Sequence, residues 1–329
     1  HLKAEGAWDA AAGRYTLTLS QHTPPTAGQP DKLPLHIPVA VGLLGPDGAD
    51  LPLVLEGEAG PGDTTRVLEL KEASRSWTFT GLSAEPVPSV LRGFSAPVIL
   101  DIAEGDARLA FRMAHDADPF NRWDAAQRYM ERVILALAAD AAAGRALEVP
   151  QAFGHAFRAL LINDSLDPAF VAETLALPSE AYLLERMQPA DPAPLRAALI
   201  HLTRGLAHAM QADFLSRYLD LEVEGEYRYH PADAGRRSLR NLCLRYLTAW
   251  GGATAIDLAL KQFEHAGNMT ERYGALAALA QSDAPARFEA LEAFHQRYQG
   301  DALVLDKWFQ LQAGAWRWSD AAPDTLERV

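Results

Sequence analysis

The apolar residues of this chain change their spacing once, near residue 114, and this change constrains the fold more than any other feature. From Arg14 to about Met113 they recur at every second position, which places alternate side chains on one face of a sheet. After Ala114 they recur at steps of three and four, as on one side of a helix. We therefore expect a multi-domain chain of β then α class, with a small β-sandwich connector domain over residues 1–115 and an irregular α-helical, solenoid-like domain over residues 116–329.

Short segments of period two, separated by Gly, Pro and Ser, predict the strands of the sandwich. The clearest segment covers residues 35–43. The sequence Gly45-Pro46-Asp47-Gly48 follows it and predicts a hairpin whose second strand returns over residues 51–55. Further strands are expected over residues 15–19, 65–70, 76–80, 87–91, 98–102 and 109–113.

Three Asp-Pro pairs predict helix starts, because the aspartate can cap the first turn and proline needs no N–H donor there. They are Asp118-Pro119, Asp167-Pro168 and Asp191-Pro192. The last pair precedes an apolar stripe that predicts one buried helix face, formed by Leu195, Leu199, Leu202, Leu206, Met210 and Phe214. Asn268 and Glu271 predict a capping box. No fixed repeat length separates these starts, which favours an irregular solenoid.

Composition excludes several classes of function. The formal net charge of -13 opposes binding to nucleic acid. No apolar run approaches the roughly 20 residues that cross a bilayer, so no membrane association is expected. Cys243 is the single cysteine, which excludes an intrachain disulfide and a cysteine-based zinc cluster. A reducing compartment fits best, and the predicted location is cytoplasmic.

No complete catalytic or metal-binding motif is present in the sequence. None of the ten histidines is followed by glutamate, so the His-Glu-x-x-His zinc motif is absent. His201 and His208 would share a helix face, but no third ligand lies nearby in sequence. Ser95 imitates a nucleophile elbow, yet Pro97 replaces the last glycine of that motif. We expect no catalytic residue and no metal ligand in this chain.

Two charged segments lie in the helical part. The acidic segment, Asp220, Glu222, Glu224 and Glu226, is interpreted as a solvated edge, with a cation site as the alternative. The basic segment presents Arg236, Arg237, Arg240 and Arg245 on a predicted helix. These arginines either form salt bridges to the acidic segment or recognise a carboxylate or a partner surface.

Five segments, taken in order, resemble a known family. They are Leu35-His36-Ile37-Pro38-Val39-Ala40, Phe94-Ser95-Ala96-Pro97-Val98, Asn121-Arg122-Trp123-Asp124-Ala125-Ala126-Gln127, Asn268-Met269-Thr270 and Asp306-Lys307-Trp308-Phe309-Gln310-Leu311-Gln312-Ala313. Together they resemble the C-terminal half of bacterial aminopeptidases N, members of the M1 zinc metallopeptidase family. The resemblance covers the β-sandwich connector and part of the helical C-terminal domain, and runs from about Gly13 to Ala313.

The resemblance implies a parent hydrolase that removes N-terminal residues from peptides in peptide catabolism. Its zinc and its catalytic residues belong to a preceding domain, so this chain would carry no cofactor and would be inactive alone. The implied partners are the catalytic domain of the same polypeptide and the peptide substrate. The helical domain would enclose the active-site chamber and restrict substrate access. An independent helical-repeat scaffold for protein interactions is the alternative function.

The family motifs also supply candidate residues for domain packing or for lining the chamber. They are Arg122, Trp123, Asp124, Asn268, Met269, Thr270, Asp306, Lys307 and Trp308. Trp123 is expected to pack the first helix against the last strands of the sandwich.

The family's helical domain continues past the position that matches Val329, so the chain is expected to be truncated there. A truncated helical stack leaves an apolar face uncovered. Self-association is therefore predicted through Trp308, Phe309, Leu311, Trp316, Trp318, Leu326 and Val329.

Overall fold

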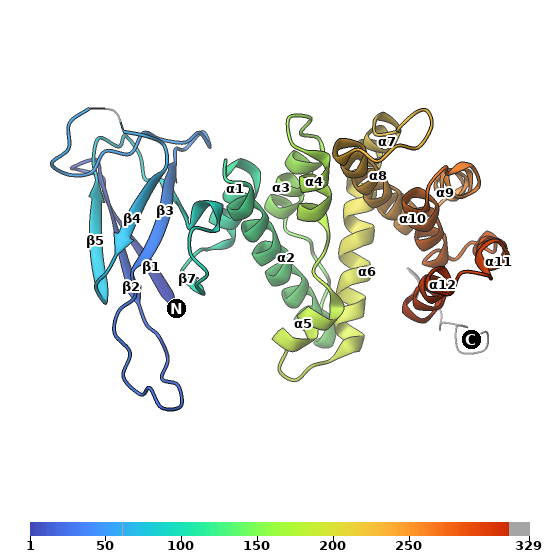
Figure 1. Cartoon of the computed structure of the whole chain (residues 1–329), viewed down its shortest axis with the longest axis horizontal. Helices are drawn as coiled ribbons and strands as arrows, with labels where there is room; N and C mark the ends of the chain where they lie inside the picture. The colour runs from blue at the N-terminus through green and yellow to red at the C-terminus, as the bar shows by residue number, and fades with distance from the viewer. Residues whose placement is uncertain (61, 316–329) are drawn as a thin grey trace. The chain divides into compact units, whose positions relative to one another are not determined.

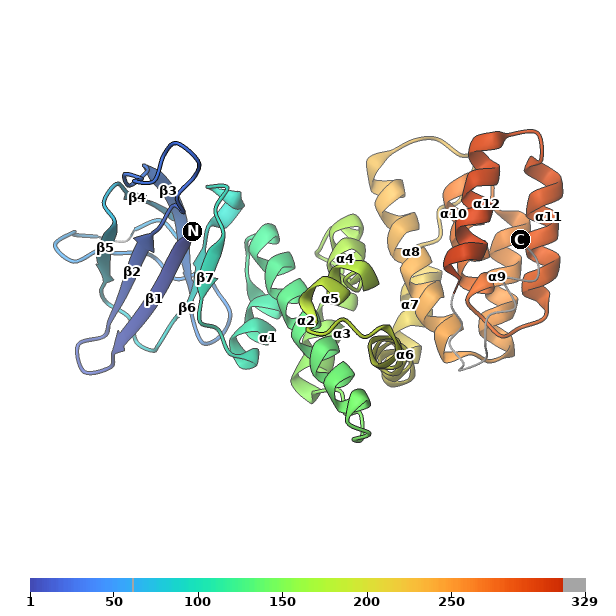
Figure 2. The same ribbon diagram turned by 90° about the horizontal axis from the view of Figure 1, so that it is seen from below.

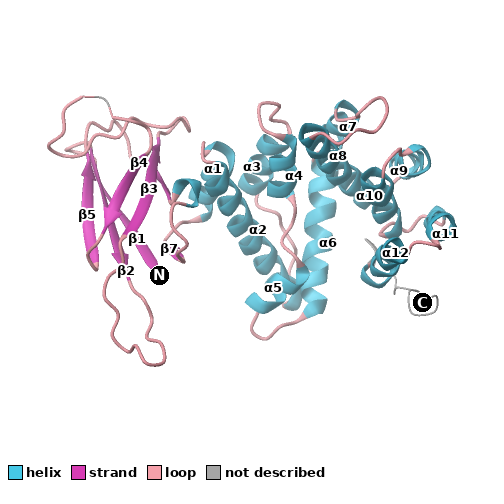
Figure 3. Cartoon of the chain, in the orientation of Figure 1, coloured by secondary structure: helices cyan, strands magenta, loops and turns pink. Residues whose placement is uncertain are grey.

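A computed structural model describes residues 1–60 and 62–315 of the chain (Figure 1). The chain divides into two compact units, His1–Tyr129 and the residues from Met130 onward. All the strands that the structure describes belong to the first unit, and helices make up the second (Figure 3). The predicted order of β before α is confirmed.

The first unit contains a sandwich of two small sheets. Its strands are β1 (Leu2–Asp9), β2 (Arg14–Gln21), β3 (Ile37–Leu44), β4 (Arg66–Leu70), β5 (Ser74–Phe79), β6 (Val87–Val90) and β7 (Leu100–Ile102). One sheet has the order β5-β2-β1-β7 and the other has the order β4-β3-β6. Neighbouring strands are antiparallel except for β1 and β7, which pair in parallel.

Apolar and hydroxyl side chains alternate along β2, so one face of the strand is buried in the core and the other faces solvent. Tyr15, Leu17 and Leu19 are buried between the sheets. The intervening threonines and serine face outward and pair with hydroxyls of β5, as Thr18 does with Ser76 at 2.8 Å between the two oxygens. Each strand of this pair therefore contributes one face to the core and one to a surface row of hydrogen bonds.

The predicted hairpin is wrong in its second strand. The turn after β3 forms, and the Leu51 N–H donates to the Leu43 carbonyl at 2.8 Å, but no strand follows over residues 51–55. Pro52 has no N–H to continue the ladder, and the Leu53 N–H donates to the Asp63 carbonyl instead. Strand β3 pairs with β4 and β6.

The predicted strand at 109–113 is also wrong, because this segment lies within helix α1 (Asp106–His115). Leu109 and Met113 are both buried, and a spacing of four residues fits a helix face as well as a strand face. Five residues are too few for the period to decide between the two.

Helices continue from this point to the end of the described residues. The helix α2 (Pro119–Ala142) is followed by α3 (Gln151–Leu161), α4 (Pro168–Leu175), α5 (Glu180–Arg186), α6 (Pro192–Ala209), α7 (Gln211–Asp220), α8 (Pro231–Trp250), α9 (Ala253–His265), α10 (Met269–Ala280), α11 (Ala286–Tyr298) and α12 (Ala302–Gly314). A short 3-10 turn, η1 (Arg92–Phe94), lies between β6 and β7. No helix among residues 1–60 and 62–315 is both long and apolar enough to cross a membrane.

The three Asp-Pro starts are confirmed by hydrogen bonds. The Asp118 carboxylate accepts from the Asn121 N–H at 2.8 Å, and Asp167 and Asp191 accept from backbone N–H groups of the first turns of α4 and α6. The stripe on α6 is buried as predicted, but it spans two helices. Helix α6 ends at Ala209, and Phe214 belongs to α7.

Helix α8 is central to the second unit, where it packs against α4, α6, α7 and α10. Helix α10 packs against α9 and α11, and α11 packs against α12, so these four helices form one group (Figure 2). Phe157 of α3, Phe214 of α7 and Tyr246 of α8 meet in one buried aromatic cluster. The rings of Phe214 and Tyr246 stack with centroids 4.6 Å apart. This cluster holds three helices that lie far apart in sequence.

Cys243 of α8 is buried in the core of the second unit, and this burial raises the pKa of its thiol to about 12. At pH 8 only about one molecule in ten thousand then carries the reactive thiolate. We predict that iodoacetamide leaves the native chain unmodified and alkylates Cys243 once urea unfolds it. Stoichiometric alkylation of the folded chain within minutes would show that the thiol is accessible.

Candidate functional site

A buried polar network joins strand β6 to helices α1 and α2 within the first unit. The Asn121 side chain donates to the Ser89 hydroxyl at 2.8 Å and to the Val90 carbonyl at 3.1 Å. Ser89 in turn donates to the Asp116 carboxylate at 2.9 Å. Burial raises the pKa of the Asp116 carboxyl, while Arg112 opposes this shift. Hydrogen bonds, rather than apolar contact alone, therefore position the first helices on the sandwich.

Arg112 is the centre of this network and is fully buried. Its Nη1 atom donates to both oxygens of Glu104 at 2.9 Å, and its Nε donates to Asp116 at 3.3 Å. The Nη2 atom donates to the Asn121 carbonyl at 3.3 Å. Every nitrogen of the guanidinium is thus satisfied, which offsets the cost of burying its charge.

A constrained turn at η1 supports the same network. Leu91 and Phe94 both have positive φ angles, of 65° and 52°, which residues other than glycine rarely adopt. The Gly93 N–H donates to Asp118 at 2.7 Å. Arg92 forms a bidentate pair with Asp50 at 2.8 and 2.6 Å. The turn presents the Phe94 ring, which is 51% exposed, beside the ring of Phe120 at 5.0 Å.

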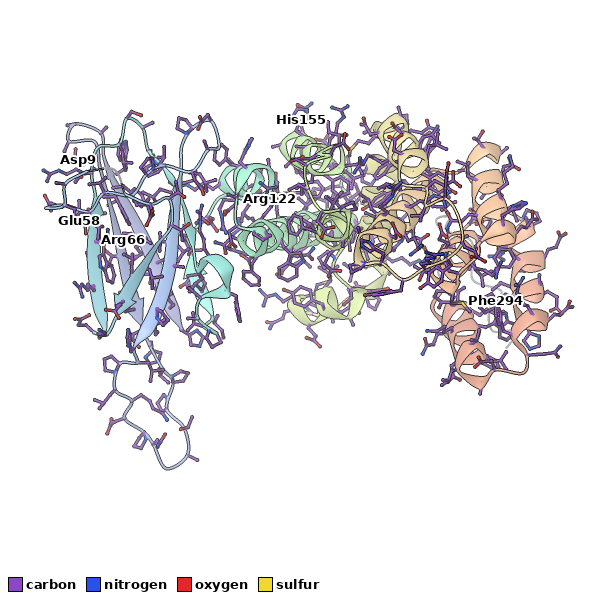
Figure 4. The ribbon with its side chains drawn as sticks, turned by 45° about the horizontal axis from the view of Figure 1, so that its top comes forward. Asp9, Glu58, Arg66, Arg122, His155 and Phe294 are labelled. Atoms are coloured by element: carbon purple, nitrogen blue, oxygen red, sulfur yellow. The ribbon has the colours of Figure 1, made fainter. Side chains whose placement is uncertain are left out.

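The first three candidate residues lie on α2, next to this network. Arg122 is buried, and its Nε has no hydrogen-bond partner among the described residues (Figure 4). Burial lowers the pKa of this guanidinium. Trp123 is half-buried, with its ring 5.9 Å from Phe120, and Asp124 lies 3.6 Å from Arg128. The hydrogen bonds to β6 come from Asn121, which the sequence reasoning did not select.

A cavity of about 740 Å³ lies in the second unit between α8, α9, the start of α10 and the loop before α8. The acidic segment and the basic segment meet here, as one interpretation of the sequence expected. Arg240 is buried, and its three nitrogens donate to Glu271, to Glu222 and to the Tyr218 carbonyl at 2.9, 3.3 and 3.3 Å. Arg236 donates to two backbone carbonyls of the acidic segment.

Arg237 lines the same cavity, but its hydrogen bonding differs from that of Arg240. Its side chain is 4% exposed, yet its Nε has no hydrogen-bond partner among the described residues. The nearest carboxylate oxygen, in Glu271, is 4.0 Å away. The Tyr227 ring covers the guanidinium, with its centroid 4.9 Å from the Arg237 Cζ atom.

Asn268 also lines this cavity and caps α10. Its Oδ1 accepts from the Glu271 N–H at 3.0 Å, and its Nδ2 donates to the Glu271 carboxylate at 2.6 Å. The predicted capping box is therefore present. Met269 and Thr270 follow in the first turn of α10, and the Thr270 carbonyl accepts from Asn241 at 3.1 Å.

The last three candidates lie on α12, away from the cavity lining. Asp306 and Lys307 are exposed. Trp308 is half-buried, and its Nε1 donates to the Leu291 carbonyl at 2.9 Å. Phe309 is 45% exposed. Of the other residues predicted for self-association, Trp316, Trp318, Leu326 and Val329 lie outside the described residues.

A zinc ion does not fit the side chains that the structure describes. No group of three or more His, Cys, Asp or Glu residues among 1–60 and 62–315 has the arrangement of a metal site. His201 and His208 gain no third ligand, and the His208 ring stacks on Trp250 with centroids 4.3 Å apart. Ser95 accepts from the Ala40 N–H at 2.9 Å, which is a structural role.

Comparison with known proteins agrees with this architecture. A family model described as a domain of unknown function, DUF3458, with an Ig-like fold matches residues 1–103. A second, described as DUF3458_C with ARM repeats, matches residues 106–329.

Similar proteins are bacterial aminopeptidases N. The aminopeptidase N of Escherichia coli is 38% identical, and the match covers 96% of this chain and 35% of that protein. The aminopeptidase N of Caulobacter vibrioides is 41% identical, and the match covers 99% of this chain and 36% of that protein. A crystal structure of Legionella pneumophila aminopeptidase A in complex with aspartic acid has 25% identity and a TM-score of 0.77, covering 99% of this chain and 36% of that one. The chain thus spans about a third of the length of these relatives. It belongs to the DUF3458_C family of ARM-repeat domains, preceded by an Ig-like DUF3458 domain, and is homologous to the C-terminal region of bacterial aminopeptidase N.

Proposed function

We propose that this chain is the non-catalytic C-terminal portion of a zinc aminopeptidase that removes N-terminal residues from peptides. The observation that carries the proposal is the match of nearly the whole chain to one contiguous third of the aminopeptidases N. The catalytic domain of the same polypeptide would be its partner, and zinc would belong to that domain. The cytoplasm is the proposed location, because the single cysteine requires no oxidising compartment.

The proposed role of the helical domain is to enclose the active-site chamber and to restrict access to peptide ends. Stacked helices of the ARM type supply a continuous wall, and an exopeptidase benefits from a wall that refuses folded proteins. We also propose that the boundary between the two domains lies between residues 115 and 116. Nine residues are proposed either to pack the domains together or to line the chamber: Arg122, Trp123, Asp124, Asn268, Met269, Thr270, Asp306, Lys307 and Trp308.

The test is a hybrid enzyme in which this chain replaces the matching third of Escherichia coli aminopeptidase N. The control is the same enzyme without that third. The hybrid should hydrolyse a short peptide while sparing a folded protein with the same N-terminal residue. Equal cleavage of the folded protein by the hybrid and by the shortened control would refute a role in access, and would leave the independent interaction scaffold as the better reading.

The isolated chain is predicted to be inactive and free of stoichiometric zinc, because its described residues form no metal site. Metal analysis by mass spectrometry and an assay with an amino-acid amide substrate check both points. One tightly held zinc per chain, together with hydrolysis that a chelator abolishes, would contradict this prediction.

A further inference from the structure

The cavity at α8 contains a buried arginine, Arg237, with one hydrogen-bond donor that is unmet among the described residues. Arg237 and Arg240 lie one helical turn apart on the same face of α8 and contact the same carboxylate, Glu271. Arg240 uses all three of its nitrogens, whereas the Nε of Arg237 has no partner among the described residues. A buried guanidinium with an unmet donor is costly, so its retention calls for a ligand or another function.

Glu271 cannot fully supply that partner. One of its oxygens accepts from Arg240 at 2.9 Å and the other accepts from Asn268 at 2.6 Å. Arg240 pairs with Glu222 as well as with Glu271, whereas the one described carboxylate near Arg237, that of Glu271, stays 4.0 Å from its Nε. Arg237 is among the residues that line this cavity.

The rest of the lining limits which anion fits. Glu224 and Glu226 lie on the loop side of the cavity, while Arg228 and Lys261 add cations. Acidic groups so close to the arginine disfavour a dianion such as phosphate, because like charges repel. A ligand with a single carboxylate on an otherwise neutral or cationic molecule suits a cavity that is lined by both acidic and basic side chains. Guanidinium and carboxylate also match in shape, because two parallel N–H groups meet two oxygens.

We propose that the cavity binds the α-carboxylate of a peptide or a free amino acid, with Arg237 as the residue that receives it. The Tyr227 ring, which already covers the guanidinium, would shield the ion pair from water. The choice of a peptide-derived ligand rests on the proposed function. The cavity lies wholly within the second unit, so binding is measurable on the chain without any aminopeptidase activity.

The test is an NMR titration of the full chain with trialanine, trialanine amide and alanine, observing arginine Nε–Hε signals. The Arg237 signal is assigned by its loss in Arg237→Gln. Trialanine is expected to shift this signal, and its amide should bind at least about tenfold more weakly because it lacks the charge. Binding of alanine as tight as that of trialanine would assign the site to free amino acids, and weaker binding would assign it to peptide ends.

Arg297→Gln, on the exposed face of α11, is the matched control for loss of one positive charge. It should keep the affinity within about twofold, while Arg237→Gln should lose at least about tenfold. Arg237→Lys keeps the positive charge but lacks the two parallel N–H donors of the guanidinium, so it too should bind trialanine more weakly. This variant replaces Arg237→Gln in the test if the glutamine variant does not fold. Equal binding of acid and amide, or equal binding by wild type and both Arg237 variants, would overturn the proposal. The hybrid-enzyme assay does not depend on this ligand, so the two failures are distinguishable.

Discussion

Replacement of Arg112 by methionine is expected to lower the free energy of unfolding of the first unit by about 3–5 kcal/mol. Arg112 is fully buried and pairs with Glu104 and Asp116, both of which are also buried. Methionine fills much of the same volume but leaves two carboxylates without their shared partner. Urea unfolding followed by circular dichroism measures the change.

Arg108→Met is the matched control, because it lies one turn earlier on α1 and pairs with Glu85 at the surface. An exposed ion pair contributes about 0–1 kcal/mol, so this variant should stay close to wild type. Similar losses for the two variants would mean that the buried network does not hold α1 and α2 on the sandwich.

Replacement of Phe214 by alanine is expected to lower the stability of the second unit by about 3–5 kcal/mol. The ring is fully buried, stacks on Tyr246 and meets the edge of Phe157. Its loss opens a cavity where α3, α7 and α8 converge. Phe309→Ala removes a ring that is 45% exposed and should cost about 1 kcal/mol or less. A loss below about 1 kcal/mol for Phe214→Ala, measured by thermal or urea unfolding, would contradict this packing.

The sequence predicts the order of domains and the starts of four helices, α2, α4, α6 and α10, because both depend on local rules. The side chains of Asp167 and Asp191 each accept a hydrogen bond from the backbone N–H two residues later. The aspartate and the two residues after it are therefore enough to recognise each helix start. Strand β1 was not predicted. Among its eight residues only Leu2 and Ala4 are buried, so it shows little alternation that a sequence pattern could reveal.

The candidate site is less predictable, because its contacts join residues that are distant in sequence. Trp123 was selected at the junction of sandwich and helices for its size, but the hydrogen bonds to β6 come from Asn121. Burial of polar groups depends on partners that no local pattern specifies. The opposite charges of the acidic and basic segments predict their meeting as one of two alternatives, whereas the unmet donor of Arg237 is visible only in the packed structure.

The proposal that this chain belongs to an aminopeptidase polypeptide is tested most directly by isolating the native polypeptide that contains it. An antibody raised against the chain would capture it from the source cells, and peptide sequencing by mass spectrometry with metal analysis would follow. Because this chain covers 35% and 36% of the length of its relatives, we predict a polypeptide about three times as long. It should carry a His-Glu-x-x-His segment before this region and one zinc per molecule. A captured polypeptide without that segment and without zinc would contradict the account.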